Sequence, residues 1–266
     1  MHATWNLVAK QQAGNYSVIY LSFLFSSVVT VSMSIPYLGS IDYSTNTVLL
    51  LVLSGVLHAV YGFVLTFTYQ NGDISTLYPI VRGSGIAGSV MLSLVILHET
   101  FTPVSGLGVC LVIGGIGILS YRRNRIATSP KGIFLALVCG AFIMSYTILD
   151  KVLVDGIHPI PVLAASQIIS TFLFMPYVLT KRKQELIMTF KTLLMPTLII
   201  SVVATSSYLI ILYAMQMAPI GRIVAVREAS VVFGAMAGYL LLKETFSKTR
   251  LIGVIVVMIG IILVKM

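Results

Sequence analysis

Long apolar stretches separated by short polar turns make up almost the whole sequence. Nine of these stretches are long enough to cross a lipid bilayer, because a spanning helix needs about 20 mostly apolar residues. The turns between them contain Gly, Pro, Asp, Lys or Arg, and none is long enough to form a soluble domain. The predicted spans cover residues 16–37, 47–69, 74–97, 102–121, 132–150, 160–180, 192–214, 218–242 and 249–265, and residues 1–10 form a further short segment of helical character.

The composition supports a polytopic membrane protein. Of the 266 residues, 58% are hydrophobic and 9% are charged, and the mean hydropathy is +1.00. Soluble domains usually have about 25% charged residues. The net charge of +9 raises the question of a nucleic-acid partner, but the basic residues lie in short turns between apolar stretches, as in membrane proteins. We therefore expect a lipid bilayer and no nucleic acid. Cys110 and Cys139 lie inside apolar stretches and are expected to be packing residues.

The two halves of the chain match when one is shifted onto the other. Arg227 follows Arg82 by 145 residues, and the same shift superimposes several polar and glycine positions. A matched arginine inside an apolar stretch carries more weight than matched apolar residues. We therefore predict a first membrane repeat in 1–121, a cytoplasmic linker in 122–131 and a second repeat in 132–266. The matches are Arg82 with Arg227, Met91 with Met236, Glu99-Thr100-Phe101 with Glu244-Thr245-Phe246, Gly108 with Gly253 and Gly115 with Gly260.

The second repeat holds five predicted spans, whereas the first holds four and the short segment 1–10. Counting back along the repeat places a complete first span partly before Met1. We therefore expect the native start to lie upstream, with the first helix largely missing from this sequence. A unit with an odd number of spans enters the membrane upside down in its second copy. The expected fold is an all-α polytopic protein with two inverted five-helix repeats, the ten-helix type, in which substrate sites lie near the midplane.

Lysine and arginine positions predict the orientation. Cytoplasmic loops of membrane proteins are enriched in these residues. Alternate loops of this chain carry almost all of them, whereas the loops between hold only Lys151 and Arg222, with Lys265 near the end. This bias places both termini outside. The predicted cytoplasmic loops carry Lys10, then Arg122, Arg123, Arg125 and Lys131, then Lys181, Arg182, Lys183 and Lys191, then Lys243, Lys248 and Arg250.

Arg82 and Arg227 are the first candidates for a functional site. Each lies about 13 Å inside its predicted span, at 1.5 Å per residue. An intramembrane charge is costly and usually marks a substrate or ion pathway. Two arginines suit anionic groups such as carboxylate or phosphonate. The alternative is that each arginine snorkels or pairs with a neighbour to hold helices together.

Other polar residues lie at mid-span depth. Glu228 is interpreted as the only acidic residue well inside a span, where it carries a coupling proton or neutralises an arginine. His58, with Tyr61 one turn on, either binds substrate or a proton or is a hydrogen-bonded packing residue. Gln167 and the run from Thr205 to Tyr208 line a cavity or form hydrogen bonds across helices.

The Glu-Thr corners are interpreted as structural. Glu99 and Glu244 each end a span, and the threonine that follows is expected to be the N-cap of the next helix. The sequence contains no Gly-Lys-Ser/Thr phosphate loop, no His-Glu-x-x-His, no Cys-x-x-Cys and no Gly-x-Ser-x-Gly. We expect no enzyme activity, no nucleotide-driven pumping, no cofactor and no bound metal.

With these residues in view, the chain resembles the EamA-type branch of the drug/metabolite transporter superfamily. The stretch from Tyr69 to Gly83 resembles the family's Tyr-x-x-Gly-Asp-x-Ser-x-x-Tyr-Pro-x-x-Arg-Gly segment. The matching part of the second repeat is Met217-Ala218-Pro219 and Val226-Arg227-Glu228-x-Ser230-Val231-Val232, and His2-Ala3-Thr4-Trp5-Asn6 resembles the end of the family's first helix. The resemblance covers essentially the whole chain.

The resemblance implies a multi-pass protein of the cell (inner or plasma) membrane. It implies a secondary transporter that moves a small amino acid-like or other anionic or zwitterionic metabolite by alternating access, with export as the direction. Some relatives with the Tyr-Pro-x-x-Arg-Gly pattern are associated with phosphonate metabolism. The alternatives are a multidrug exporter of lipophilic cations and a non-transporting membrane scaffold. The residues expected at the substrate site are Arg82, Arg227, Glu228 and His58, followed by Trp5, Asn6, Tyr61, Tyr78 and Gln167.

Overall fold

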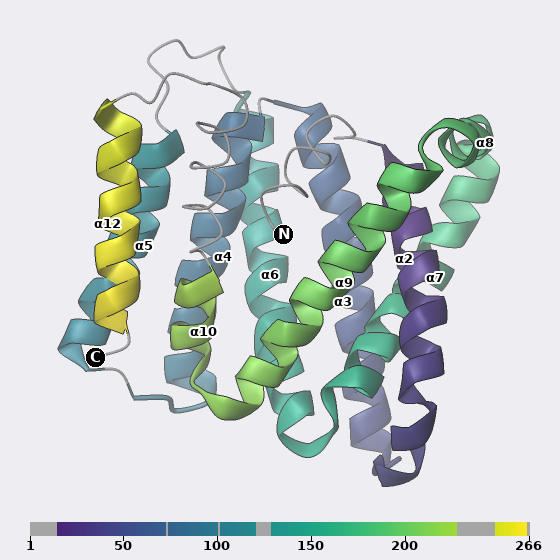
Figure 1. The fold of residues 1–266 in the computed structure, drawn as a ribbon, viewed down its shortest axis with the longest axis horizontal. Helices are drawn as coiled ribbons and strands as arrows, with labels where there is room; N and C mark the ends of the chain where they lie inside the picture. Colours follow the sequence, from purple (N-terminus) through teal and green to yellow (C-terminus); the bar gives the residue numbers. More distant parts are fainter. Residues whose placement is uncertain (1–14, 73, 101, 121–128, 228–247, 265–266) are drawn as a thin grey trace.

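The fold is a helical bundle, drawn in Figure 1. The computed structural model describes residues 15–72, 74–100, 102–120, 129–227 and 248–264, and these ranges contain helices and connecting turns without a strand. The prediction of an all-α protein is confirmed. The helices are α2 (Tyr16–Ser34), the 3-10 helix η1 (Ile35–Ser40), α3 (Thr45–Gln70), α4 (Ile74–Ile96), α5 (Pro103–Ser120), α6 (Pro130–Gly156), α7 (Pro159–Lys181), α8 (Lys183–Thr192), α9 (Leu194–Met217), α10 (Ile220–Arg227) and α12 (Lys248–Val264).

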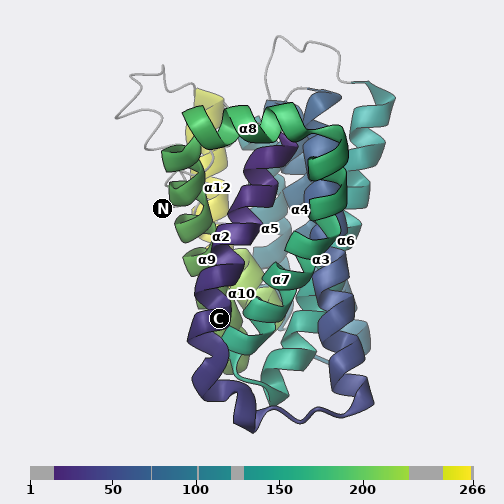
Figure 2. The same cartoon turned by 90° about the vertical axis from the view of Figure 1, so that its right-hand side faces the viewer.

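Most helices run up and down the bundle, as expected for a chain that crosses a membrane several times (Figures 1 and 2). Within the described ranges, five helical segments are long and apolar enough to span a bilayer: Tyr16–Gly39, Thr45–Gln70, Pro130–Gly156, Pro159–Lys181 and Leu194–Met217. Three shorter apolar helical segments accompany them, at Ile80–Ile96, Pro103–Ile118 and Leu251–Val264. The chain is therefore a multi-pass α-helical membrane protein, as predicted.

One helix, α6, extends well beyond its predicted end, and another, α8, was not predicted. α6 continues to Gly156, beyond the predicted end at residue 150, because apolar residues 152–154 follow Lys151 and extend the hydrophobic pattern. Lys151 therefore lies in a helix and forms an i,i+4 ion pair with Asp155. The predicted loop that follows span 160–180 contains a helix of its own, α8.

The turn at Glu99 is structural, as predicted, but the threonine that follows it, Thr100, is not the N-cap of the next helix. The side chain of Thr102, and not that of Thr100, caps α5, since its Oγ1 accepts a hydrogen bond from the backbone N–H of Ser105 at 3.1 Å. Glu99 Oε1 accepts a hydrogen bond from the backbone N–H of Ile220 at 2.8 Å. Glu99 thus satisfies a free N–H group at the start of α10, in the predicted second repeat.

Small residues let α5 and α12 pack against each other through their backbones. A Cβ atom on Gly108 would lie 2.7 Å from the carbonyl oxygen of Gly260, and one on Gly260 would lie 2.7 Å from the carbonyl oxygen of Gly108. Gly115 approaches the backbone of Val257 in the same way, and Gly260 that of Val112. The shift of 145 residues relates Val112 to Val257 and Gly115 to Gly260, so it converts the contact of Gly115 with Val257 into that of Gly260 with Val112. The division into repeats stays a prediction.

α8 lies across one end of the bundle, crosswise to the long helices (Figure 2). Its Glu185 holds the start of α2, because Oε1 accepts hydrogen bonds from the backbone N–H and the hydroxyl of Ser17, each at 3.0 Å. Glu185 also pairs with Arg182 at 3.6 Å. The side chains of Ile187 and Phe190 are exposed, which is typical of a helix lying in the membrane interface.

We expect Glu185→Ala to destabilise the end of the bundle at which α8 lies. The change removes the acceptor for two donors of Ser17, so the free energy of unfolding should fall by about 1–2 kcal/mol. Denaturant titration of the purified protein in detergent measures this quantity. Gln184→Ala, an exposed neighbour on the same helix, is the matched control, and equal losses for both variants would contradict the capping role.

At the opposite end of the bundle, three aromatic rings join η1, the α6–α7 turn and α9. The ring of His158 stacks on that of Tyr37 with centroids 3.7 Å apart, and its Nε2 lies 3.3 Å from the hydroxyl of Tyr213. Its Nδ1 accepts a hydrogen bond from the backbone N–H of Ile160 at 3.4 Å and so caps α7. This cap requires Nδ1 to be unprotonated.

Acid should weaken the His158 cap. Burial lowers the pKa of His158 from its usual 6.5, because desolvation disfavours the charged ring. The stabilisation that it supplies is therefore complete above the unfolded-state pKa and is lost as the pH falls through the lower folded-state pKa. We expect the difference in thermal midpoint between the wild type and His158→Ala to shrink on acidification. A difference that is the same at neutral and acidic pH would contradict this assignment.

Candidate functional site

A carboxylate lies buried in the middle of the bundle. The side chain of Asp150, in α6, is 1% exposed. The sequence-based statement that Glu228 is the only acidic residue well inside a span is therefore wrong, because α6 continues past Asp150 to Gly156. Glu228 itself lies outside the described residues.

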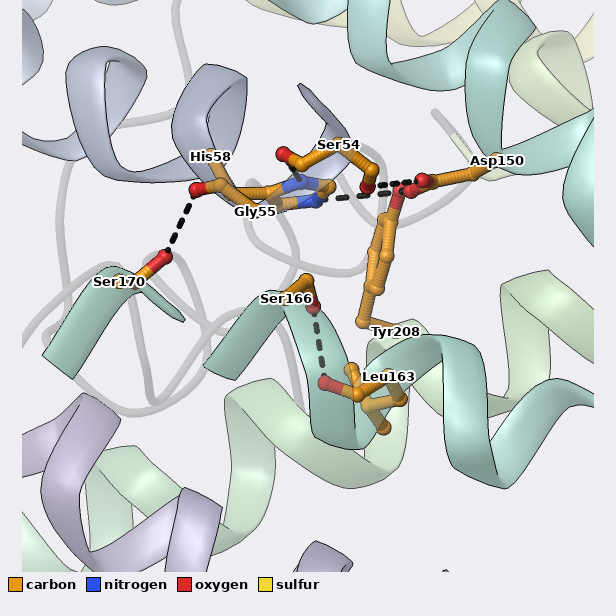
Figure 3. Close-up of polar contacts among 8 residues, drawn as sticks. All are labelled: Ser54, Gly55, His58, Asp150, Leu163, Ser166, Ser170 and Tyr208. Carbon is orange, nitrogen blue, oxygen red and sulfur yellow. Dashed lines mark hydrogen bonds and ion pairs between the residues drawn. The ribbon is translucent and has the colours of Figure 1, made fainter. Parts of the chain in front are cut away.

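Asp150 is held by side chains from two other helices (Figure 3). The hydroxyl of Ser54 in α3 donates to Oδ1 and the hydroxyl of Tyr208 in α9 donates to Oδ2, both at 2.5 Å. Nε2 of His58, also in α3, lies 3.6 Å from Oδ2. A buried carboxylate needs such donors, because leaving it without them costs several kcal/mol.

His58 lies among three tyrosine rings. The centroid of its ring is 4.1 Å from that of Tyr146 and 5.3 Å from that of Tyr208. The ring of Tyr61 meets that of Tyr146 edge-on, with centroids 5.6 Å apart. Nδ1 of His58 is 3.0 Å from the backbone carbonyl oxygen of Ser54, one turn earlier in α3. The predicted proximity of His58 and Tyr61 thus becomes part of an aromatic enclosure.

α7 closes one side of this enclosure. α3 and α7 approach closely at Gly55, where a Cβ would lie 2.6 Å from the Cβ of Ile169. The hydroxyl of Ser170 donates to the carbonyl oxygen of Gly55 at 3.3 Å (Figure 3). Gln167 lies on the same helix, and its Oε1 is buried with no hydrogen-bond partner in the described part of the chain. α7 therefore brings neutral polar groups to α3.

The two predicted arginines both lie near Tyr146. The positive charges of both Arg82 in α4 and Arg227 in α10 lie close enough to act on its phenol. Arg82 also acts on Tyr61, and Arg227 on Tyr208. Both arginine side chains are half-buried. One arginine comes from each predicted repeat, so the centre of the bundle holds two cations, an acidic group, an imidazole and several phenols.

The structure gathers part of the predicted residue set. His58, Tyr61, Arg82 and Arg227 lie around Tyr146, as described above. Tyr78 lies one turn before Arg82 in α4 and acts electrostatically on Tyr69 rather than on the His58 group. Trp5, Asn6 and Glu228 lie outside the described residues, so their assignment stays a prediction. Ser54, Tyr146 and Asp150 were not predicted from the sequence as members of this site.

The chemistry of this arrangement suits binding of a small polar molecule. Arginine donates up to five hydrogen bonds in a fixed planar geometry, and tyrosine both donates and accepts. In the ranges that the structure describes, no three His, Cys, Asp or Glu side chains lie close enough together to hold a metal ion. The site is thus made of hydrogen-bonding and charged groups inside an apolar bundle.

A family model supports a transport function. The model of the EamA-like transporter family matches residues 130–266, which is just over half of the chain and covers α6 to α12. The chain belongs to the EamA-like transporter family. This protein is therefore a membrane transporter of the drug/metabolite transporter superfamily, as the sequence motifs indicated, and Asp150, Tyr208 and Arg227 lie in the matched part.

Comparison of structures supports the fold of this EamA-like transporter. A protein of known crystal structure superimposes with a TM-score of 0.76 at 12% sequence identity, covering 99% of this chain and 94% of that chain. At such low identity the likeness shows the fold alone. No curated protein matches the sequence.

Proposed function

We propose that this EamA-like transporter is a secondary carrier that exports a small anionic or zwitterionic metabolite by alternating access. The observation that carries the proposal is that Arg82 and Arg227, from different helices, both lie near enough to Tyr146 to act on its phenol electrostatically. Two guanidinium groups inside an apolar bundle suit a ligand with a carboxylate or phosphonate group. An amino acid-like compound satisfies this requirement, since it has a carboxylate and a small polar body.

The buried acid does not argue against an anionic ligand. Asp150 already accepts hydrogen bonds from Ser54 and Tyr208 and faces His58. Its negative charge is therefore compensated locally, within the His58 group. The arginines approach Tyr146 from α4 and α10, which are different helices from those that hold the carboxylate.

The distribution of the site over the predicted repeats supports alternating access. Arg82 and His58 belong to the first predicted repeat, and Asp150 and Arg227 to the second. In transporters with inverted repeats, rocking of one repeat against the other opens a midplane site to either side in turn. A ligand held by both arginines would bridge the two parts that move.

We further propose that the α8 end of the bundle faces the cytoplasm of a cell whose inner or plasma membrane holds the protein. Basic residues concentrate at this end, in agreement with the rule for cytoplasmic loops. The end of α12 at Val264 would then lie outside (Figure 1), and the outside position of Met1 stays a prediction. A reporter fused to Met266 that is active only in the cytoplasm would overturn this orientation. The basic residues at this end include Lys131, Lys181, Arg182, Lys183 and Lys191, against Lys151 and Arg222 toward the other.

A second candidate function is export of lipophilic cations. The observation that favours it is the buried Asp150 beside the rings of Tyr146 and Tyr208, since carboxylates and aromatic faces both attract cations. The two arginines argue against it, because they repel a cationic ligand. Transport assays with both ligand classes separate the two candidates.

Cysteine accessibility tests whether the arginine site belongs to a transport pathway. The natural thiols are first removed by Cys110→Ser and Cys139→Ala, and then Arg82→Cys and Arg227→Cys are introduced singly. A water-soluble, membrane-impermeant thiol reagent should label both from either side of the membrane. Arg222→Cys, at an exposed position in the first turn of α10, should react from one side only. Failure of both arginine positions to react would favour a non-transporting scaffold.

A further inference from the structure

We propose that His58 and Asp150 form the proton-binding site of this transporter. One proton crosses the membrane in the opposite direction for each substrate molecule that is exported. The proposal rests on the proposed transport function and adds its energy source. It assigns one exchangeable proton to the gap between Nε2 of His58 and Oδ2 of Asp150, which are 3.6 Å apart.

Hydrogen bonding fixes which nitrogen of His58 exchanges the proton. Nδ1 lies 3.0 Å from the backbone carbonyl oxygen of Ser54, and a carbonyl oxygen only accepts. Nδ1 therefore carries a hydrogen in both the neutral and the charged ring. Nε2 is buried without a hydrogen-bond partner in the described residues and points at Asp150. Nε2 is the atom that gains or loses the proton.

The surroundings of Asp150 are arranged for the gain or loss of a proton at Nε2 of His58. Its two oxygens already accept from Ser54 and Tyr208, so the carboxylate is held in one orientation with Oδ2 toward His58. When Nε2 is protonated, the pair is an imidazolium and a carboxylate with no net charge. When Nε2 is unprotonated, its lone pair faces the carboxylate and the pair carries one negative charge. The step is a proton transfer alone, in which one N–H bond forms or breaks.

The other ionisable groups around the pair stay in one form near neutral pH. α3 adds Tyr61, α6 adds Tyr146 and α9 adds Tyr208, and phenols ordinarily titrate near pH 10. α4 and α10 add Arg82 and Arg227, which are always charged. α7 presents the neutral side chains of Ser166, Gln167 and Ser170. The transported proton is therefore assigned to the pair formed by His58 and Asp150.

The position of the pair couples this proton to conformation. His58 and Ser54 lie in the first predicted repeat, whereas Asp150 and Tyr208 lie in the second. Movement of one repeat against the other changes the distance between Nε2 and Oδ2, and therefore the affinity for the proton. Linkage is reciprocal, so protonation in turn favours one of the two conformations. Asp150 is 1% exposed and the imidazole 13%, so the proton reaches them only when a conformation admits water.

Two transport assays with the purified protein in liposomes test the proposal. The probes are radiolabelled glutamate, alanine and phosphonoacetate, each used separately. Counterflow measures exchange at equal pH and needs no net proton movement, whereas accumulation into liposomes with an acidic interior requires proton antiport. With one proton per substrate, and with the membrane potential held at zero by potassium and valinomycin, a gradient of about one pH unit supports about tenfold accumulation of a transported probe.

We expect the wild type to show both activities and Asp150→Asn to lose gradient-driven accumulation to a much greater extent than counterflow. Asp155→Asn, an exposed residue of the same helix paired with Lys151, should keep both. Absence of counterflow in the wild type would contradict the transport function itself. Counterflow without gradient-driven accumulation in the wild type, or accumulation by Asp150→Asn, would overturn the proton site alone.

A measurement that needs no substrate covers the case in which Asp150→Asn does not fold. Nitrogen NMR of the wild type labelled at its histidines reports the tautomer of His58 directly, with His58→Gln providing the assignment. We expect neutral His58 to carry its hydrogen on Nδ1. A neutral ring with its hydrogen on Nε2 would remove the proton acceptor and overturn the proposal.

Discussion

Replacing Arg82 and Arg227 together with glutamine is expected to reduce flux of anionic and zwitterionic substrates by about two orders of magnitude, because each charge-assisted contact is worth about 1.5–3 kcal/mol. Each single variant should lose about tenfold on the same scale. Glutamine keeps much of the side-chain length and its donors, so the change removes mainly the charge. Initial rates of counterflow in liposomes provide the measurement, with the amount of folded protein determined by size-exclusion chromatography.

The chain supplies a matched control for the arginine variants. Arg222 is exposed and lies in the same helix, α10, as Arg227, and Arg222→Gln should leave flux unchanged. Arg82→Lys should give an intermediate rate, since lysine keeps the charge but loses the planar double contact. Normal flux after both Arg82 and Arg227 are replaced would rule out an arginine-lined substrate site.

Gly108→Ala is expected to be the most destabilising single-methyl change in α5. The added Cβ would lie 2.7 Å from both the carbonyl oxygen of Gly260 and the backbone N of Val264. Backbone atoms of a packed helix cannot move aside singly, so α5 and α12 must separate. Overpacking of this kind typically costs about 1–3 kcal/mol. The free energy of unfolding in mixed detergent micelles measures the effect.

Other glycines of α5 provide the control for this steric argument. A Cβ on Gly114 or Gly117 would meet nothing within 4 Å. Gly114→Ala should therefore be neutral or slightly stabilising, by up to about 1 kcal/mol, because alanine restricts the unfolded chain and favours the helix. Equal destabilisation by Gly108→Ala and Gly114→Ala would show that the close approach of α5 and α12 does not matter.

Hydropathy alone predicted the membrane-spanning helices well, because the apolar stretches are long and the turns short. It failed where the pattern was interrupted by charge. Lys151 suggested the end of a span after Asp150, yet apolar residues 152–154 carry α6 on to Gly156. The same three residues were the available signal that Asp150 lies inside the membrane helix. α8 was missed because its ten residues are too few and too polar to resemble a span.

The candidate site was only partly predictable for a different reason. Arg82 and Arg227 stood out because a charge in an apolar stretch is rare and the repeat matched the two. Ser54 and Asp150 did not stand out, because their hydrogen bond joins positions 96 residues apart and depends on how α3 and α6 pack. Tyr146 was hidden among many aromatic residues, although it lies one helical turn before Asp150 and shares its face.

A counterflow screen in liposomes tests the central claim most directly. The purified protein would be offered amino acids, phosphonates and lipophilic cations as separate labelled probes. An arginine-lined transport site predicts saturable flux of at least one anionic or zwitterionic probe and none of the cations. Flux of cations alone, or no flux of any probe by protein shown to be folded, would contradict it.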